Sequence, residues 1–277
     1  MRSAFEILVV EDEAVVVESV KRILVPEGFS VDATESSEEA TQMLQQGAYG
    51  IILVDLVLPG VSGLQLIDLL RKSHPGAITI MISGLATREN VIEAFRCGAF
   101  DFIPKPFSFE ELLGPVRRAV EVLQRGEGGL PGQERAGRGP LSAPVESSIS
   151  VPPSEPWSAY RFLGDHIWAK FEEDGSAVIG VDDTFGGVLE GIESAEFPGA
   201  FEEILQGHVC VRMTTKDKNV HLVWCAISGV VVESNAGIAT GETGEGSTGA
   251  AYNGTWLVRV WPQAQDEVSN LKSYDEL

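Results

Sequence analysis

Carboxylates that could bind a divalent cation directly follow two apolar runs in the N-terminal half of the chain. Glu11 and Asp12 come after Ile7–Val10, and Asp55 comes after Ile51–Val54. Three carboxylates brought to one place repel one another unless a hard cation lies among them. Mg2+ suits this set because it takes few protein carboxylates, keeps several waters and accepts a phosphate oxygen. We therefore predict that Glu11, Asp12 and Asp55 bind magnesium.

A hydroxyl and an ammonium group follow two further apolar runs. Ser83 comes after Ile78–Ile82, and Lys105 lies two residues beyond Phe100–Ile103. A hydroxyl and a cation are groups that stabilise the oxygens of a transferring phosphoryl group. A single Asp after a strand is most often a cap, but polar groups after four apolar runs indicate a functional site. Their chemistry indicates phosphoryl transfer.

The apolar runs alternate with amphipathic segments from residue 6 to residue 124. Two of the runs are apolar throughout, which is typical of parallel strands covered by helices on both faces. Hydroxyl residues stand ahead of acidic first-turn residues at two helix starts. We predict an α/β fold with a doubly wound, five-stranded parallel sheet, whose ligand site lies outside the carboxyl ends of the strands. The expected strands are Ile7–Val10, Ser30–Ala33, Ile51–Val54, Ile78–Ile82 and Phe100–Ile103, and the expected helices are Ala14–Val25, Ser37–Gln46, Gly63–Lys72, Arg88–Phe95 and Phe109–Leu123.

On these residues, segment 1–124 resembles a response-regulator receiver domain, which has a flavodoxin-like fold. Glu11 and Asp12 match the acidic pair of that family, and Asp55 matches its phosphoacceptor. Ser83 matches the switch hydroxyl, and Lys105 matches the lysine. The resemblance implies that a histidine kinase or a phosphotransfer protein supplies the phosphoryl group to Asp55, with Mg2+ neutralising the developing charge. The chain is then not an enzyme, apart from catalysing its own phosphorylation and dephosphorylation.

The resemblance also implies a change of shape on phosphorylation. Phe102 falls at the aromatic switch position and would turn inward when Ser83 bonds the phosphoryl oxygen, although a plain core aromatic is the alternative. The bond between Lys105 and Pro106 is expected to be cis, as in similar receivers. Val57 and Leu85, two residues beyond Asp55 and Ser83, offer no polar group to position water, so we predict slow self-hydrolysis. The residues assigned in this way to phosphorylation and to the switch are Asp55, Lys105, Ser83 and Phe102.

Residues 125–156 are rich in Gly, Pro and Ser and contain little that could build a core. We predict that they form a flexible linker between a first domain at 1–124 and a second at 157–277.

The second domain is predicted to be mainly β, with many glycines between short apolar runs. Asp-Lys-Asn is good turn chemistry, so we expect Lys218 at or near the tip of a hairpin. Asn235–Gly249 is expected to be a mobile loop. The strands are expected at His166–Phe171, Ala177–Val181, His208–Met213, His221–Ile227, Val230–Glu233 and Trp256–Trp261, and short helices at Asp182–Leu189 and Glu267–Leu277. His208 and His221 are expected to be strand residues rather than ligands.

Residues 160–277 resemble the glycine-cleavage H protein, a relative of the lipoyl domain with a barrel-sandwich hybrid fold. The matching segments, in family order, are His166-Ile167-Trp168, Gly180–Phe185, Lys218, Ser228–Asn235 and Tyr252–Leu257. In those families the lysine carries lipoate in amide linkage, which removes its charge and adds a long arm. The resemblance thus implies lipoate on Lys218.

Three residues around this lysine depart from the family pattern. Thr215 stands where an acidic residue is usual, Lys216 is an additional cation, and Asn219 replaces a small alanine. Two alternatives for the output therefore stay open. The domain is a lipoyl carrier in one-carbon or sulfur metabolism, or it is a scaffold that contacts a partner protein without a lipoyl arm. The sequence does not identify that partner.

Composition excludes several other classes of function. Lys and Arg number 20 against 41 Asp and Glu, a net charge of −21, and residues 157–277 are the more acidic part. Such a surface is a poor binder of nucleic acid or anionic membranes, and no helix-turn-helix pattern is present. The three cysteines lack metal or disulfide spacing and are expected to be reduced core thiols. With no long apolar run, the chain is expected to be cytoplasmic.

Overall fold

The computed structural model describes residues 6–47, 49–125, 160–239, 255–273 and 276. The chain divides into two compact units, Met1–Leu130 and Pro131–Leu277. The boundaries predicted at 124 and 157 stay a prediction, because residues 126–159 lie outside the described part of the chain, as do residues 240–254.

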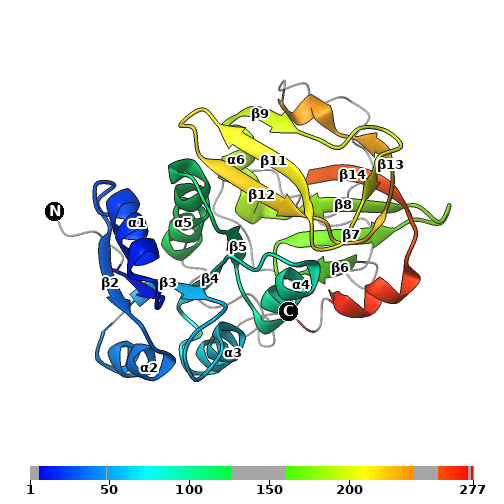
Figure 1. Cartoon of the computed structure of the whole chain (residues 1–277). Coiled ribbons are helices and arrows are strands. Elements are labelled where there is room, and N and C mark those ends of the chain that lie inside the picture. Colours follow the sequence, from blue (N-terminus) through cyan, green and yellow to red (C-terminus); the bar gives the residue numbers. More distant parts are fainter. Residues whose placement is uncertain (1–5, 48, 126–159, 240–254, 274–275, 277) are drawn as a thin grey trace. The chain divides into compact units, whose positions relative to one another are not determined.

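The first unit is a five-stranded parallel sheet with the strand order β2-β1-β3-β4-β5 (Figure 1). Because each strand is followed by a helix and runs in the same direction, the carboxyl ends of all five strands meet at one edge of the sheet. The central strands are buried along most of their length, as the apolar runs predict. The strands are β1 Glu6–Val10, β2 Ser30–Thr34, β3 Tyr49–Asp55, β4 Ile78–Ser83 and β5 Asp101–Pro104.

Five helices cover the two faces of this sheet. Helices α1 and α5 lie on one face and α2 and α3 on the other, with α4 beside α3 (Figure 1). The hydroxyls of Ser36 and Ser108 accept hydrogen bonds from backbone N–H groups of the first turns of α2 and α5, which confirms the predicted caps. The helices are α1 Ala14–Leu24, α2 Ser37–Gln46, α3 Gly63–Ser73, α4 Arg88–Cys97 and α5 Phe109–Gln124.

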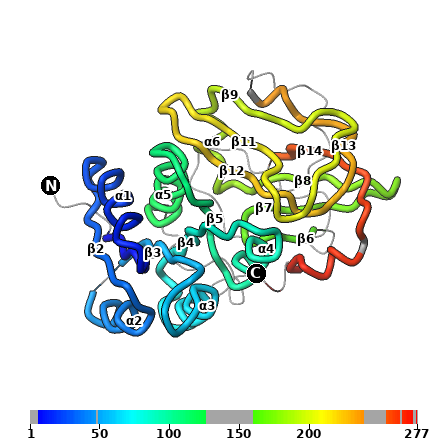
Figure 2. The backbone as a smooth tube through the Cα atoms, viewed as in Figure 1, coloured from blue at the N-terminus to red at the C-terminus, as the bar shows by residue number. Residues whose placement is uncertain are grey.

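The second unit contains two antiparallel sheets (Figure 2). A seven-stranded sheet has the order β10-β13-β14-β8-β7-β6-β15, and a three-stranded sheet has the order β12-β11-β9. The chain crosses from β8 to β9 through the short helices η2 Asp183–Phe185 and α6 Gly186–Glu190. The remaining elements are β6 Tyr160–Leu163, β7 Ile167–Phe171, β8 Ala177–Val181, β9 Ile192–Glu196, β10 Glu203–Ile204, β11 Val209–Thr215, β12 Val220–Trp224, β13 Gly229–Ser234, η3 Ala236–Ala239, β14 Thr255–Pro262, η4 Gln265–Asn270 and β15 Lys272–Ser273.

The core of the second unit includes an aromatic cluster. Trp168 and Tyr160 are fully buried and meet edge to face, with ring centroids 5.5 Å apart. Gly180 of β8 faces the Trp168 ring so closely that an added Cβ would lie 2.2 Å from a ring carbon. The strand can pass this ring only because residue 180 has no side chain.

The predicted fold class is confirmed for both units, and two local predictions are wrong. The expected helix Glu267–Leu277 is instead η4 followed by β15, because the backbone of Lys272–Ser273 pairs with the edge strand β6. His208 lies in a turn before β11, whereas His221 is a strand residue as expected. Of the expected loop Asn235–Gly249, the described part contains η3, and the rest lies outside the described residues. The strands β6, β9, β10 and β15 were not predicted.

The cysteines are free thiols, as expected. Cys210 and Cys225 are buried, and burial raises the pKa of the Cys225 thiol well above its usual value. Cys97 is only half-buried on α4.

Substituting Gly180→Ala should destabilise the second unit by about 1–3 kcal/mol, because its Cβ would overlap the Trp168 ring and the Thr255 carbonyl. All five tryptophans lie between residues 157 and 261, so tryptophan fluorescence during urea unfolding reports on this unit. Gly186→Ala is the matched control, since nothing lies within 4 Å of its added Cβ. Equal midpoints for the two variants would contradict the packing argument.

Candidate functional site

Three carboxylates meet at the carboxyl edge of the parallel sheet. Glu11 and Asp12 directly follow β1, and Asp55 is the last residue of β3, the strand that pairs with β1. One oxygen from each lies within 4.8 Å of the others. Glu11 and Asp55 are buried, while Asp12 is exposed to solvent. The structure thus brings together the three residues that the sequence assigned to a magnesium site.

The Lys105 ammonium lies among these carboxylates. Its Nζ is 2.6 Å from a Glu11 oxygen and 2.7 Å from Asp55 Oδ1, and its side chain is only 13% exposed. Lys105 reaches this position because its backbone N–H donates to the Ser83 carbonyl at the end of the neighbouring strand. One cation therefore compensates two buried anions.

Burial and ion pairing shift two pKa values at this edge. Burial raises the pKa of Glu11, an effect that the hydrogen bond with Lys105 only partly offsets. Burial lowers the pKa of Lys105, but hydrogen bonds with Asp55 and Glu11 outweigh it and the net pKa lies above its usual value. The charged form of Glu11 is thus less favourable here than in water even with Lys105 beside it, and Lys105 reduces that cost.

Ser83, the last residue of β4, is buried, and its hydroxyl accepts a hydrogen bond from the backbone N–H of Leu85 at 3.0 Å. In the same way the backbone N–H of Val57 donates to Asp55 Oδ2 at 2.6 Å. These bonds order the two loops, yet they leave the side chains of Val57 and Leu85 57% and 53% exposed. Neither of these two exposed side chains carries a polar group.

Phe102 is buried in β5, opposite Met81 of β4. This position fits both a core aromatic and the inward position of a switch residue. The peptide bond between Lys105 and Pro106 is cis, as the resemblance to receivers implied.

One acidic neighbour was missed by the sequence analysis. Glu13 follows the predicted pair by one residue; its carboxylate lies 3.6 Å from Lys105 Nζ and its side chain is 66% exposed. The run Glu11-Asp12-Glu13 is visible in the sequence, but nothing there shows that its third member also reaches the lysine.

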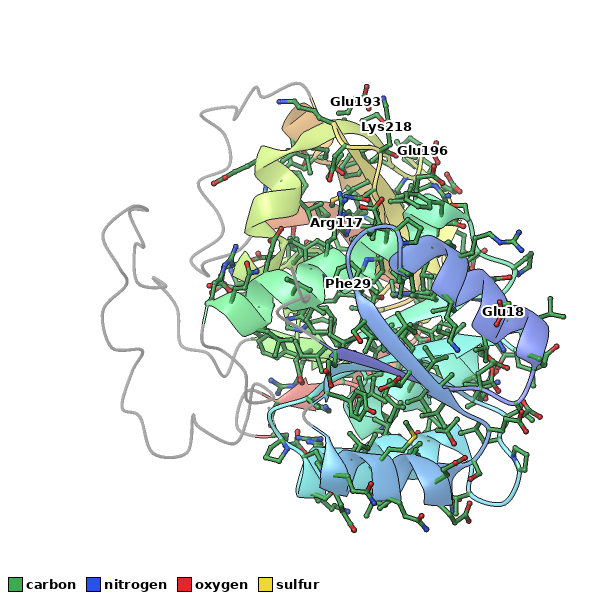
Figure 3. The ribbon with its side chains drawn as sticks, turned by 90° about the vertical axis from the view of Figure 1, so that its left-hand side faces the viewer. Glu18, Phe29, Arg117, Glu193, Glu196 and Lys218 are labelled. Carbon is green, nitrogen blue, oxygen red and sulfur yellow. The ribbon has the colours of Figure 1, made fainter. Side chains whose placement is uncertain are left out.

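The second candidate residue, Lys218, lies in the turn between β11 and β12, as predicted. Its φ of 69° is in the left-handed region, which costs a non-glycine residue about 1–2 kcal/mol. Its side chain is 65% exposed, and Nζ lies 2.5 and 2.7 Å from the two carboxylate oxygens of Glu193 in β9. Figure 3 shows both residues at one edge of the second unit. Glu193 was missed because β9 was not predicted.

The turn that holds Lys218 is closed by hydrogen bonds between Asp217 and two of the residues that depart from the family pattern, Thr215 and Asn219. Thr215 donates to one oxygen of Asp217, and Asn219 donates to the other, both at 2.5 Å. The backbone N–H of Thr215 donates to the Asn219 carbonyl, and that of Lys218 donates to the Thr215 carbonyl. This hydrogen-bonded clasp offsets the cost of the left-handed conformation and fixes the direction in which Lys218 leaves the turn.

Family models match both units. Residues 7–117 match the response regulator receiver domain, and residues 160–277 match the glycine cleavage H-protein. The chain joins a receiver domain to an H-protein domain. The receiver is the parallel-sheet unit, and the H-protein domain is the unit that carries Lys218.

Curated relatives match the receiver domain and are response regulators. The transcriptional regulatory protein CusR of Escherichia coli K12 is 33% identical over 121 residues, which cover 44% of this chain and 52% of CusR. The nitrogen assimilation regulatory protein NtrX of Azorhizobium caulinodans is 34% identical over 123 residues, covering 44% of this chain and 27% of NtrX. The chain thus spans about half or less of the length of these relatives. It is related to two-component response regulators through its receiver.

Solved receiver structures are also similar to this unit. A CheY-like receiver domain protein from Methanospirillum hungatei is 28% identical, with a TM-score of 0.43, and the match covers 45% of this chain and 99% of that one. The receiver domain of NtrX from Brucella abortus is 36% identical, with a TM-score of 0.40, and the match covers 42% and 98%.

The residues present fit the groups that these families use. One carboxylate oxygen each from Glu11, Asp12 and Asp55 lies within 4.8 Å of the others, and Asp12 is exposed to solvent. These oxygens form the hard donor set that Mg2+ prefers. In the H-protein domain, the exposed Lys218 amine at the tip of a rigid turn is accessible for an amide linkage. No helix of the described residues is long and apolar enough to cross a membrane.

Removing the Lys105 cation should destabilise the receiver domain strongly when no divalent ion is present. Lys105→Ala leaves Glu11 and Asp55 buried without a counter-charge, which costs about 3–5 kcal/mol. The matched control is Lys72→Ala, whose pair with Asp68 is exposed and contributes less than about 0.5 kcal/mol. Because the long helices of the described residues all lie in the receiver, circular dichroism at 222 nm follows its urea unfolding.

These unfolding curves are measured first with a chelator and then with millimolar Mg2+, which should restore much of the lost stability. A Lys105→Ala receiver as stable as the Lys72→Ala one in the chelator would show that the lysine does not compensate the carboxylates.

Proposed function

We propose that this chain is a phosphorylatable response regulator in which Asp55 accepts the phosphoryl group. The observation that carries the proposal is the placement of Asp55 within hydrogen-bond distance of Lys105 and beside the carboxylates of Glu11 and Asp12. Phosphoryl transfer needs an in-line nucleophile and cations around the transferring oxygens. Both kinds of group stand at this one edge of the sheet.

In the proposed reaction a carboxylate oxygen of Asp55 attacks the phosphorus of a phosphohistidine. The new P–O bond forms as the P–N bond breaks, and the imidazole of the donor kinase or phosphotransfer protein leaves. Mg2+ bound by Glu11, Asp12 and Asp55 would neutralise charge on the phosphoryl oxygens. Lys105 then exchanges its pair with Asp55 for one with the phosphoryl group, and the Ser83 hydroxyl donates to a second phosphoryl oxygen.

The same step explains how phosphorylation would change the receiver surface. A Ser83 hydroxyl that turns toward the phosphoryl group breaks its hydrogen bond with Leu85 and shifts the loop after β4. Because Phe102 is already buried, we propose that the shift of this loop, and not an inward turn of Phe102, is the two-state change that alters the receiver surface. With no DNA-binding pattern in the chain, the H-protein domain is the proposed output, acting through contact with a partner protein.

Phosphorylation is tested by mass spectrometry of the full chain after treatment with acetyl phosphate and Mg2+. We expect one added phosphoryl group that a chelator prevents, with Asp55→Asn unlabelled. Asp68→Asn is the matched control, because Asp68 is an exposed acid on α3 outside the site. An unlabelled wild-type chain, or labelling that persists in Asp55→Asn, would contradict the proposal.

Self-hydrolysis of the phosphorylated receiver should be slow, with a half-life of roughly hours, because the exposed residues Val57 and Leu85, two beyond Asp55 and Ser83, have no polar side-chain group to orient water. Val57→Asn supplies a group that can orient water and should shorten the half-life roughly tenfold or more. Val15→Asn, which changes a valine that is 79% exposed on α1, is the control. Loss of the phosphoryl group is followed by intact-mass spectrometry after removal of the phosphodonor. A wild-type half-life of seconds would contradict this prediction.

A second candidate function belongs to the H-protein domain. The exposed amine of Lys218, presented by the clasp, favours a lipoyl carrier in dithiol chemistry, with phosphorylation controlling delivery of the arm. Intact-mass spectrometry of the chain from its native cells, or from cells that supply lipoate, should show one lipoyl adduct that is lost in Lys218→Arg and kept in Lys216→Arg. Absence of the adduct from native cells would instead support the scaffold that acts by contact alone.

A further inference from the structure

The Lys218 amine has a carboxylate partner from another strand. β9 pairs antiparallel with β11, and the register shifts between Thr214 and Thr215, whose partners are Ser194 and Ile192. Glu193 lies at this register shift, between Ile192 and Ser194. Its two oxygens lie 2.7 and 2.5 Å from Lys218 Nζ, so the contact is bidentate (Figure 3).

The acidic residue next to the lysine in sequence does not take this role. The two carboxylate oxygens of Asp217 accept hydrogen bonds from Thr215 and Asn219 and thereby hold the clasp together. The two acids thus have different roles: Asp217 accepts the hydrogen bonds that close the turn, and Glu193 pairs with the Lys218 ammonium group.

We infer that Glu193 is a positioning residue that restrains acylation of Lys218: it holds the amine against β9 as an ammonium ion and releases it when the amine is acylated. This inference rests on the proposed carrier function. An ammonium nitrogen has no lone pair to attack with, so the proton must first pass to water. The nitrogen of the free amine then forms a C–N bond with the carbonyl carbon of an acyl adenylate, its N–H bond breaks as a proton passes to water, the C–O bond breaks and adenylate leaves. The resulting amide carries no charge, and its contact with Glu193 as an ion pair ends.

The size of the effect follows from the exposure of the pair. The side chains of Lys218 and Glu193 are 65% and 43% exposed, so solvent screens their attraction. An exposed ion pair contributes a few tenths to about 1 kcal/mol, which converts to a change of about two- to fivefold in the rate of acylation. Glu193 therefore restrains the lysine without blocking its modification.

The test uses trace acylation of the full-length chain with acetic anhydride at fixed pH and low salt. Peptide mass spectrometry gives the ratio of acetylation at Lys218 to that at Lys216, an internal reference in the same turn. In Glu193→Gln we expect this ratio to rise about two- to fivefold. Glu193→Asp, which keeps the charge on a shorter side chain, should return the ratio part of the way toward the wild-type value. Glu196→Gln removes a second exposed carboxylate from β9, one whose strand partner is Arg212, and should leave the ratio unchanged.

A second arm separates this inference from the carrier proposal. The same variants are incubated with a lipoate ligase, lipoate and ATP, which generate the acyl adenylate, and lipoylation is followed by intact mass. If the wild-type chain takes no lipoyl group but the acetylation ratio rises in Glu193→Gln, the carrier proposal fails and the restraint by Glu193 stands. If the ratio in Glu193→Gln equals that of the wild type, the inference fails whether or not lipoylation occurs.

Discussion

The receiver domain depends on the compensation of gathered negative charge. A parallel sheet brings the ends of β1 and β3 side by side, and here those ends carry Glu11, Asp12 and Asp55. Two of these carboxylates are buried, where an uncompensated charge is costly. Lys105 supplies the compensation from β5, and its contacts with Glu11 and Asp55 hold the carboxylates in one place. A site made of mutually repelling groups that depends on cations responds readily to a change in charge such as phosphorylation.

The H-protein domain arranges charge in the opposite way, because its Lys218 ammonium is exposed to solvent. Hydrogen bonds among Thr215, Asp217 and Asn219 close the turn and fix a left-handed residue at its tip. Two of the residues that depart from the family pattern, Thr215 and Asn219, are therefore structural partners of each other. Glu193 then determines where the exposed Lys218 amine lies when it is not acylated. In both domains, a carboxylate–lysine pair holds the residue on which the proposed modification takes place.

Much of the fold could be predicted from sequence, since unbroken apolar runs and hydroxyl caps are local signals. The order of polar residues after successive strands also located the receiver site, because parallel strands end at a common edge. The contact between Glu193 and Lys218 could not be predicted, since it depends on a strand with no clear apolar alternation and on a register shift. For the same reason β15 was mistaken for a helix: its conformation is set by pairing with β6, which is distant in sequence.

The central claim is that Glu11, Asp12 and Asp55 form one magnesium site on which phosphorylation depends. Isothermal titration calorimetry of the full chain with Mg2+ tests it most directly. Asp12→Asn removes a proposed ligand, and Glu18→Gln, at an exposed position of α1, is the matched control. The account predicts one Mg2+ per chain in the wild type and in Glu18→Gln, and a loss of at least about tenfold in affinity in Asp12→Asn, as for a lost charged ligand. Equal affinities in Asp12→Asn and the wild type would contradict it.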